Sequence, residues 1–181
     1  SVTGELGYEI HCGAAEHIGL RKLLLAAGVV LGLREVGFNA LLSLRLEKSF
    51  GIWNAEFTQG YTPAQTGRDR GIAWDKGDFV GRAAALAERD GNGPGQVLAT
   101  LKIDAGDADA GGYEPVWQGD ERVGFVTSGG YGHAVGSSLA MAMIDRGQAA
   151  EGARLSVRIV GVARAAKVIA ASPYGPAGRA R

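Results

Sequence analysis

The chain has 181 residues, with 19 basic and 19 acidic side chains and a formal net charge of zero. Its 30 glycines are roughly 17% of the residues, against about 7% in average proteins, which predicts a turn-rich chain. A hydrophobic fraction of 46% permits a sizeable core and excludes disorder of the whole chain. Balanced charge argues against a nucleic-acid binder, and the longest apolar stretch, 23–33, is too short to span a bilayer.

The single cysteine cannot form an internal disulfide, which favours a cytoplasmic or otherwise reducing location. No initiator methionine or leader-like segment precedes the first turn, at residues 4–7. The three residues before that turn are too few to form a stable hairpin. We therefore expect the chain to be the C-terminal part of a longer protein.

The first half of the chain predicts helices and little sheet. Alternation over Tyr8–Cys12 is typical of a half-buried strand, with Cys12 on its inner face. Apolar residues at helical spacing predict a helix over 14–31, and a second helix over 34–50 is apolar on most sides and should be buried on more than one. We further expect a short helix at 64–66, a strand at 72–74 and a helix over 79–89 that Asp78 caps.

The second half predicts only strands. The cluster Gly91-Asn-Gly-Pro-Gly95 stops the preceding helix and marks a domain boundary. Six short alternating runs follow, at 97–103, 114–118, 122–127, 138–144, 155–160 and 163–170. A small closed barrel would hide the edges of such short strands, and a sandwich is the alternative. The fold class is therefore α+β, with an α+β body over 1–91 and a β-barrel domain over 95–181.

Few residues carry an obvious chemistry. Glu9 near the first turn could accept two hydrogen bonds from a heterocycle, although a solvated carboxylate is the plainer interpretation. Arg45 and Glu47 lie on the apolar second helix and should be paired, either to stabilise the fold or to bind a ligand. His11, Cys12 and His17 lack the further ligands that a zinc site needs.

Two other site patterns are disfavoured. The glycine-rich run 129–136 lies between strands, which favours a β-connection over a phosphate-binding loop at a helix N-terminus. No Gly-x-Ser-x-Gly occurs, so a hydrolase nucleophile elbow is not expected.

Five motifs together resemble the aminomethyltransferase family, which includes the glycine cleavage system T-protein and the folate-binding C-terminal regions of dimethylglycine and sarcosine dehydrogenases. They are Thr3-Gly-Glu-Leu-Gly-Tyr-Glu-Ile10, Ser43-Leu-Arg-Leu-Glu-Lys48, Asp78-Phe-Val-Gly-Arg82, Gly112-Tyr-Glu-Pro-Val116 and Val123-Gly-Phe-Val-Thr-Ser-Gly-Gly-Tyr-Gly-His133. The segments 53–56 and 174–178 look closer to the dehydrogenase-linked branch. The resemblance covers nearly the whole chain.

The resemblance implies three domains around a funnel for tetrahydrofolate, the last a barrel of six strands. It places residues 1–91 in the folate-binding body and the remainder in the barrel. It also implies that the N-terminal portion of the same protein, with the family's catalytic aspartate, is missing here. We therefore assign no catalytic residue.

The resemblance further implies the cofactor contacts. Glu9 matches the glutamate that contacts the pterin ring, and Ile10 and His11 follow it along the funnel. A second ligand-facing position, a tyrosine in relatives, falls at Arg70. Two more positions depart from the family pattern, with Val2 in place of a tyrosine and Leu41 in place of an arginine, so we expect altered folate contacts.

The implied reaction moves a one-carbon unit from a small amine-derived donor to N5 of tetrahydrofolate, giving 5,10-methylenetetrahydrofolate. FAD would belong to a separate domain of a longer protein, because no flavin motif occurs in this sequence. Neither nucleic acid nor a membrane is an expected partner. The competing hypothesis is a non-catalytic or folate-deficient scaffold domain of a multidomain oxidoreductase.

Overall fold

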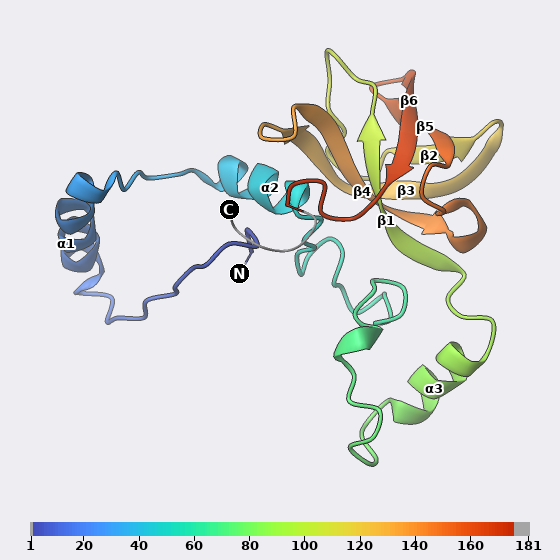
Figure 1. Cartoon of the computed structure of the whole chain (residues 1–181), viewed down its shortest axis with the longest axis horizontal. Helices are drawn as coiled ribbons and strands as arrows, with labels where there is room; N and C mark the ends of the chain where they lie inside the picture. The colour runs from blue at the N-terminus through green and yellow to red at the C-terminus, as the bar shows by residue number, and fades with distance from the viewer. Residues whose placement is uncertain (1, 176–181) are drawn as a thin grey trace.

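A computed structural model describes residues 2–175 (Figure 1). Three α-helices precede the strands: α1 (His17–Gly28), α2 (Phe38–Glu47) and α3 (Arg82–Asp90). Short 3₁₀ turns occur at Val29–Leu31, Asp69–Gly71 and Arg146–Gln148. The strands are β1 (Gln96–Ile103), β2 (Pro115–Gln118), β3 (Glu121–Gly132), β4 (Ser137–Asp145), β5 (Arg154–Ile159) and β6 (Val162–Ile169). None of the helices in this part of the chain is long and apolar enough to cross a bilayer.

The six strands form a closed antiparallel barrel in the order β1-β4-β3-β2-β5-β6. Tight turns join three of the pairs. Gly119 begins the β2–β3 turn with a φ of 59°, and Val160 and Gly161 both have positive φ between β5 and β6. Such turns match the twist of the strands they join. The predicted barrel is therefore confirmed, and β3 runs through the first part of the glycine-rich segment instead of ending at 127.

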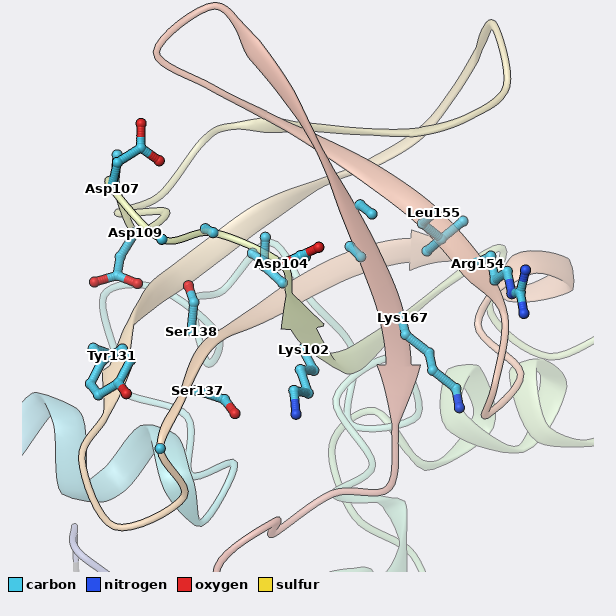
Figure 2. Close-up of a pocket in the computed structure, with 17 residues that line it drawn as sticks. Lys102, Asp104, Asp107, Asp109, Tyr131, Ser137, Ser138, Arg154, Leu155 and Lys167 are labelled. Atoms are coloured by element: carbon cyan, nitrogen blue, oxygen red, sulfur yellow. The ribbon is translucent and has the colours of Figure 1, made fainter.

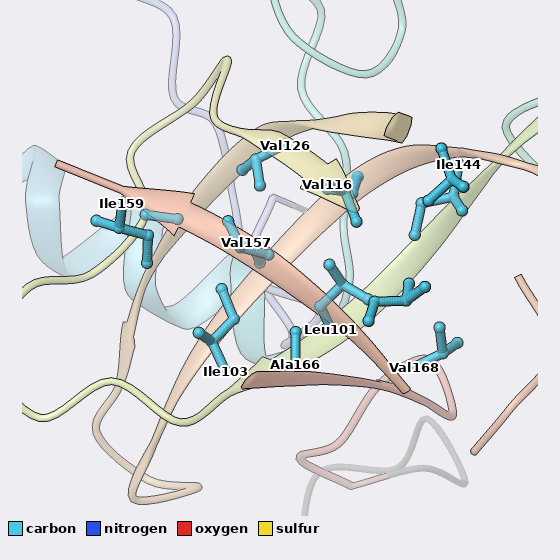
Figure 3. Packing of buried hydrophobic residues seen from close by; sticks show 14 residues of the cluster. Leu101, Ile103, Val116, Val126, Ile144, Val157, Ile159, Ala166 and Val168 are labelled. Carbon is cyan, nitrogen blue, oxygen red and sulfur yellow. The ribbon is translucent and has the colours of Figure 1, made fainter. Parts of the chain in front are cut away.

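Alternating side chains of the strands fill the barrel interior (Figure 3). The buried residues of this cluster are aliphatic, and several of them are completely inaccessible to solvent. Its members include Leu101, Ile103, Val116, Val126, Ile144, Val157, Ile159, Ala166 and Val168. Each fully buried valine, leucine or isoleucine side chain contributes about 1.5–3 kcal/mol. The barrel is thus the stable part to which α2 attaches.

A second, smaller cluster attaches α2 to the outside of the barrel. Leu46 of α2 packs with Leu139 and Met141 of β4, and all three are at most 1% exposed. In Figure 1 this helix lies against the barrel, whereas α1 lies far from it at the end of an extended segment. We call residues 2–37 the N-terminal arm.

Two expected strands in the first half are wrong. Residues 8–12 and 72–74 form no strand, because neither has a neighbouring strand with which to pair among residues 2–175. Cys12 is consequently exposed instead of facing a core. The expected short helix at 64–66 is a turn, and Asp78 accepts a hydrogen bond from Phe79 N without capping α3, whose N-cap is Gly81.

The helices predicted at 14–31, 34–50 and 79–89 do form; α1 and α2 are shorter than predicted, and α3 begins at Arg82 and ends at Asp90. Burial of the second helix differs from expectation, because only its C-terminal end is buried while Phe38 is 71% exposed. The apolar side chains at the N-terminal end of α2 do not pack against any other segment among the described residues. The division of the chain into domains at the Gly91–Gly95 linker stays a prediction.

Gly124 in β3 permits close approach of β4, since a Cβ there would lie 2.1 Å from the Met143 carbonyl oxygen. We expect Gly124→Ala to lower the free energy of unfolding by about 1–3 kcal/mol, because the strands must move apart. Chemical denaturation measures the change. Gly95→Ala is the control, since nothing lies within 4 Å of a Cβ there; equal stability of the two variants would contradict the prediction.

Candidate functional site

The C-terminal end of α2 carries a buried ion pair. Arg45 and Glu56 have side chains 4% and 0% exposed, and Arg45 Nη1 lies 3.4 Å from Glu56 Oε2. The same nitrogen donates to the Phe50 carbonyl at 3.1 Å. Burial lowers the pKa of the Arg45 guanidinium, and the Glu56 carboxylate opposes that shift. This pair confirms that Arg45 is partnered, as a charge on a buried helix face must be.

Glu56 is the centre of a hydrogen-bond network that reaches the barrel. Thr127 Oγ1 donates to Glu56 Oε1 at 2.6 Å, and Ser128 Oγ donates to the same oxygen. Ile52 N donates to the other oxygen at 2.9 Å. A carboxylate with three donors and a guanidinium beside it is fully satisfied. The network therefore fixes the loop after α2 onto β3.

Glu47 makes the second connection to the barrel. Its Oε1 accepts from the backbone nitrogens of Ala134 and Val135 at 2.6 and 2.9 Å. These residues lie in the turn between β3 and β4, at the end of the glycine-rich run. The turn thus forms a small anion-binding concavity that a side chain of this same chain fills. The structure agrees with the β-connection expected for this run.

Lys48 joins α2 to the N-terminal arm. Its Nζ lies 3.3 Å from Glu5 Oε1 and 5.0 Å from the centre of the Tyr174 ring, and its side chain is only 3% exposed. The stem is equally close to the arm, because a Cβ at Gly4 would lie 2.9 Å from Lys48 Cγ. Ser172 Oγ donates to the Lys48 carbonyl at 2.7 Å. The first turn of the arm and residues 172–174 therefore meet at Lys48.

The predicted pterin-contacting residues follow this anchored turn. Glu9 and His11 have side chains 89% exposed, and Glu9 Oε2 lies 3.9 Å from His11 Nε2. Ile10 is 57% exposed. The three residues lie on an extended segment without a strand partner, so their groups face solvent. Their role in cofactor binding stays a prediction.

Arg70 lies elsewhere, in the 3₁₀ turn Asp69–Gly71, which Figure 1 places on the α3 side of α2. It is exposed, and no ion pair or hydrogen bond joins it to Glu9 in the described part of the chain. The two positions that depart from the family pattern also remain accessible, since Val2 is 46% exposed and Leu41 is half-buried. The structure thus groups Glu9, Ile10 and His11 and leaves Arg70 apart.

Two models of one family match this chain. Residues 1–76 match the GCVT N-terminal domain, and residues 96–174 match the glycine cleavage T-protein C-terminal barrel domain. The chain belongs to the glycine cleavage T-protein family. The barrel match coincides with β1–β6, and the first match ends before α3. The resemblance inferred from five motifs is thereby confirmed.

Individual relatives support the same family assignment. The aminomethyltransferase of Moorella thermoacetica is 32% identical over 167 residues, covering 92% of this chain and 45% of that protein. Rat mitochondrial dimethylglycine dehydrogenase is 33% identical over 162 residues, covering 89% of this chain and 19% of that protein. The crystal structure of glycine cleavage system aminomethyltransferase T from Bartonella henselae superposes with a TM-score of 0.85 at 26% identity, covering 97% of this chain and 48% of that one. This chain spans about half of the aminomethyltransferases and a smaller share of the dehydrogenase.

The sequence analysis did not identify Glu56 and Lys48, which join α2 to β3 and to the N-terminal arm, respectively. Both residues lie in segments that resemble the family. Charged side chains are usually exposed, so nothing in those segments indicated that these two are buried. The signal for Lys48 was its place directly after two residues already expected to be buried and paired, Arg45 and Glu47. No comparable signal existed for Glu56, because it lies in an irregular segment and its partners Thr127 and Ser128 are distant in sequence.

Glu56→Gln tests the buried pair, because it leaves the Arg45 guanidinium without a counter-charge. We expect a loss of about 3 kcal/mol or more in unfolding free energy. Denaturant titration followed by tryptophan fluorescence measures it. Glu35→Gln is the matched control: Glu35 pairs with Arg21 where both side chains are more than half exposed, so that loss should stay below about 1 kcal/mol. Similar losses in both variants would contradict the assignment.

Lys48→Met keeps the buried stem and removes the charge that holds Glu5. We expect the amides of residues 4–8 to become more mobile on the picosecond-to-nanosecond timescale, which ¹⁵N relaxation detects as lower order parameters. Lys76→Met is the control, because Lys76 is exposed and far along the chain from the arm. Unchanged order parameters in Lys48→Met would show that other contacts hold the turn.

Proposed function

We propose that this chain is the folate-binding and barrel part of an enzyme that transfers an aminomethyl or other one-carbon unit to tetrahydrofolate. Support comes from both family models and from relatives described as aminomethyltransferases. The observation that carries the proposal is Glu9, an accessible carboxylate at the family's pterin position on a segment that starts from an anchored turn.

The residues present fit such a ligand. Glu9 accepts no hydrogen bond from the described backbone, so both of its oxygens are available to the exocyclic amine and ring N–H of a pterin. His11 lies beside it, and Ile10 offers an apolar side chain to the ring. Tetrahydrofolate would supply N5 as the acceptor of the one-carbon unit. The role of these residues is to hold and orient it.

Orientation is the main contribution that this chain can make. The Lys48–Glu5 contact fixes the start of the segment on α2, and the Arg45–Glu56 pair fixes α2 on the barrel. A carboxylate held in place loses less entropy on binding than one on a free segment, and well-oriented reactants gain several kcal/mol over free encounter. Arg70 offers a donor where relatives present an aromatic ring, so stacking there would be absent.

The N-terminal arm indicates a further partner. Its apolar side chains are unusually accessible: Leu6 is 86% exposed, Leu23 71%, and Val30 and Leu31 85% each. Apolar surface of this extent normally lies in an interface. We infer that the remainder of the family fold, which the relatives possess and these 181 residues do not cover, packs on the arm and encloses the folate site.

For the reaction, we propose a glycine- or methylamine-derived donor and 5,10-methylenetetrahydrofolate as the product. The relationship to dimethylglycine dehydrogenase supports the methylamine class, in which case FAD would act in a separate domain. The specific observation that favours the alternative, a folate-deficient scaffold domain, is the loss of family contacts at Val2, Leu41 and Arg70.

Calorimetric titration with tetrahydrofolate separates these functions. For the enzyme part we expect saturable binding that Glu9→Gln weakens by about 10- to 100-fold, because hydrogen bonds to a charged acceptor contribute about 1.5–3 kcal/mol. Glu151→Gln, at an exposed position after β4, should bind like the unchanged chain.

Equal binding by Glu9→Gln and the unchanged chain would remove Glu9 from the site. If the 181 residues do not bind tetrahydrofolate, both titrations are repeated on a longer polypeptide that includes the rest of the family fold. Absence of binding there as well would establish the scaffold alternative.

A further inference from the structure

Two serines with a left-handed backbone meet at the C-terminal end of α2. Ser49 follows the helix and has a φ of 53°, and Ser172 follows β6 and has a φ of 56°. Neither residue is a glycine, so each conformation is strained and persists only where the surrounding contacts require it. Strain of this kind is concentrated at ligand clamps and switch regions, and this pair therefore points to a function for the segment that follows β6.

Hydrogen bonds interlock the two serines. Ser172 N donates to Ser49 Oγ at 2.9 Å, and Ser172 Oγ donates to the Lys48 carbonyl at 2.7 Å. Two residues later, Tyr174 N donates at 2.9 Å to the carbonyl of the last residue of α2. Residues 172–174, which we call the C-terminal strap, are thus fixed across the end of α2 (Figure 1).

The C-terminal strap belongs to no described cavity of the barrel. Figure 2 shows a cavity of about 1000 Å³, with Lys167 of β6 among the residues that line it. None of its lining residues comes from the C-terminal strap or from the N-terminal arm. The contacts of the C-terminal strap are instead with the end of α2 and the residues just after it.

Through these contacts the C-terminal strap places an aromatic ring on a buried cation. Lys48 Nζ lies 5.0 Å from the centre of the Tyr174 ring and 3.3 Å from Glu5 Oε1. The ammonium group has no hydrogen-bond partner in the described part of the chain. A buried ammonium group without hydrogen bonds depends on nearby negative charge and on the electron-rich faces of aromatic rings. The position of this one therefore depends on Glu5 and Tyr174 together.

We propose that Tyr174 is a positioning residue for Glu9 and acts through Lys48 and Glu5. The inference rests on the proposed function, in which Glu9 holds the pterin. Without the ring, the ammonium group would be held by Glu5 alone, whose side chain is 38% exposed and therefore screened by solvent. Glu5 and Glu9 are four residues apart, so the chain between them spans at most about 14 Å. Displacement of the first turn of the arm is consequently transmitted to Glu9.

Substitutions at Tyr174 test the proposal. Tyr174→Leu keeps an apolar side chain and removes the ring, whereas Tyr174→Phe keeps the ring. Because the cation–π contact is lost at a desolvated site, we expect Tyr174→Leu to weaken tetrahydrofolate binding by about three- to tenfold. It should also lower the ¹⁵N order parameters at residues 5–9. Tyr174→Phe should match the unchanged chain in both measurements.

Phe79→Leu is the matched control. It removes a contact of the same kind from an exposed lysine, Lys76, whose Nζ lies 4.6 Å from the centre of the Phe79 ring. Tetrahydrofolate binding and the order parameters at residues 5–9 should not change in this variant.

Chemical denaturation separates positioning from a merely structural role. A structural role would lower the unfolding free energy of Tyr174→Leu and leave its tetrahydrofolate affinity unchanged, and that result would overturn the proposal. Unchanged order parameters at residues 5–9, or weak binding by Tyr174→Phe, would overturn it as well.

Failure of this proposal is distinguishable from failure of the proposed function. Equal affinities of Tyr174→Leu and the unchanged chain would remove Tyr174 and leave folate binding intact. If neither the 181 residues nor a longer polypeptide with the rest of the family fold binds tetrahydrofolate, the proposed function fails. The order parameters then decide by themselves whether Tyr174 positions the segment that carries Glu9.

Discussion

The ion pair between Arg45 and Glu56 is the constraint on which the arrangement of the first half depends. The barrel has its own aliphatic core, but outside the barrel the described side chains of residues 2–57 include few that are buried. A buried guanidinium and carboxylate repay their desolvation only when geometry and further hydrogen bonds are good. Thr127, Ser128 and Ile52 N supply those bonds. The pair thus allows one orientation of α2 on the barrel and disfavours others.

Four consecutive residues at the end of this helix connect to four different places. Arg45 reaches Glu56, Leu46 packs on β4, Glu47 binds the β3–β4 turn and Lys48 holds the first turn of the arm. Successive helical positions are rotated by about 100°, so four of them face all around the axis. The helix end is consequently buried on every side, and this explains why charged residues there need partners from separate segments.

Sequence patterns predicted the barrel well because period-2 alternation and glycine turns are local signals. The six strands were placed to within a few residues, β3 excepted, where glycines in the strand resembled a loop. The strand predicted at Tyr8–Cys12 does not form. Its alternation is typical of a strand, but no described strand lies beside it to complete the ladder. Pairing of Arg45 and Glu47 followed from burial, whereas their partners could not be predicted. Glu56 lies in an irregular loop after the helix, and the backbone nitrogens that donate to Glu47 belong to a turn of the distant barrel. Motif resemblance identified Glu9, which no local physical signal distinguishes from a solvated carboxylate.

Closure of the barrel has a kinetic consequence. β1 forms its ladders with β4 and β6, and the pairing of Thr100 with Ile169 joins the beginning of the barrel to its end. Contacts between residues so distant in sequence slow folding, because loop entropy is lost before the contacts are gained. During synthesis, β1 therefore emerges long before its second neighbour exists. Its unpaired edge stays open to other chains until β6 leaves the ribosome, and a chaperone that covers this edge would raise the yield of folded barrel.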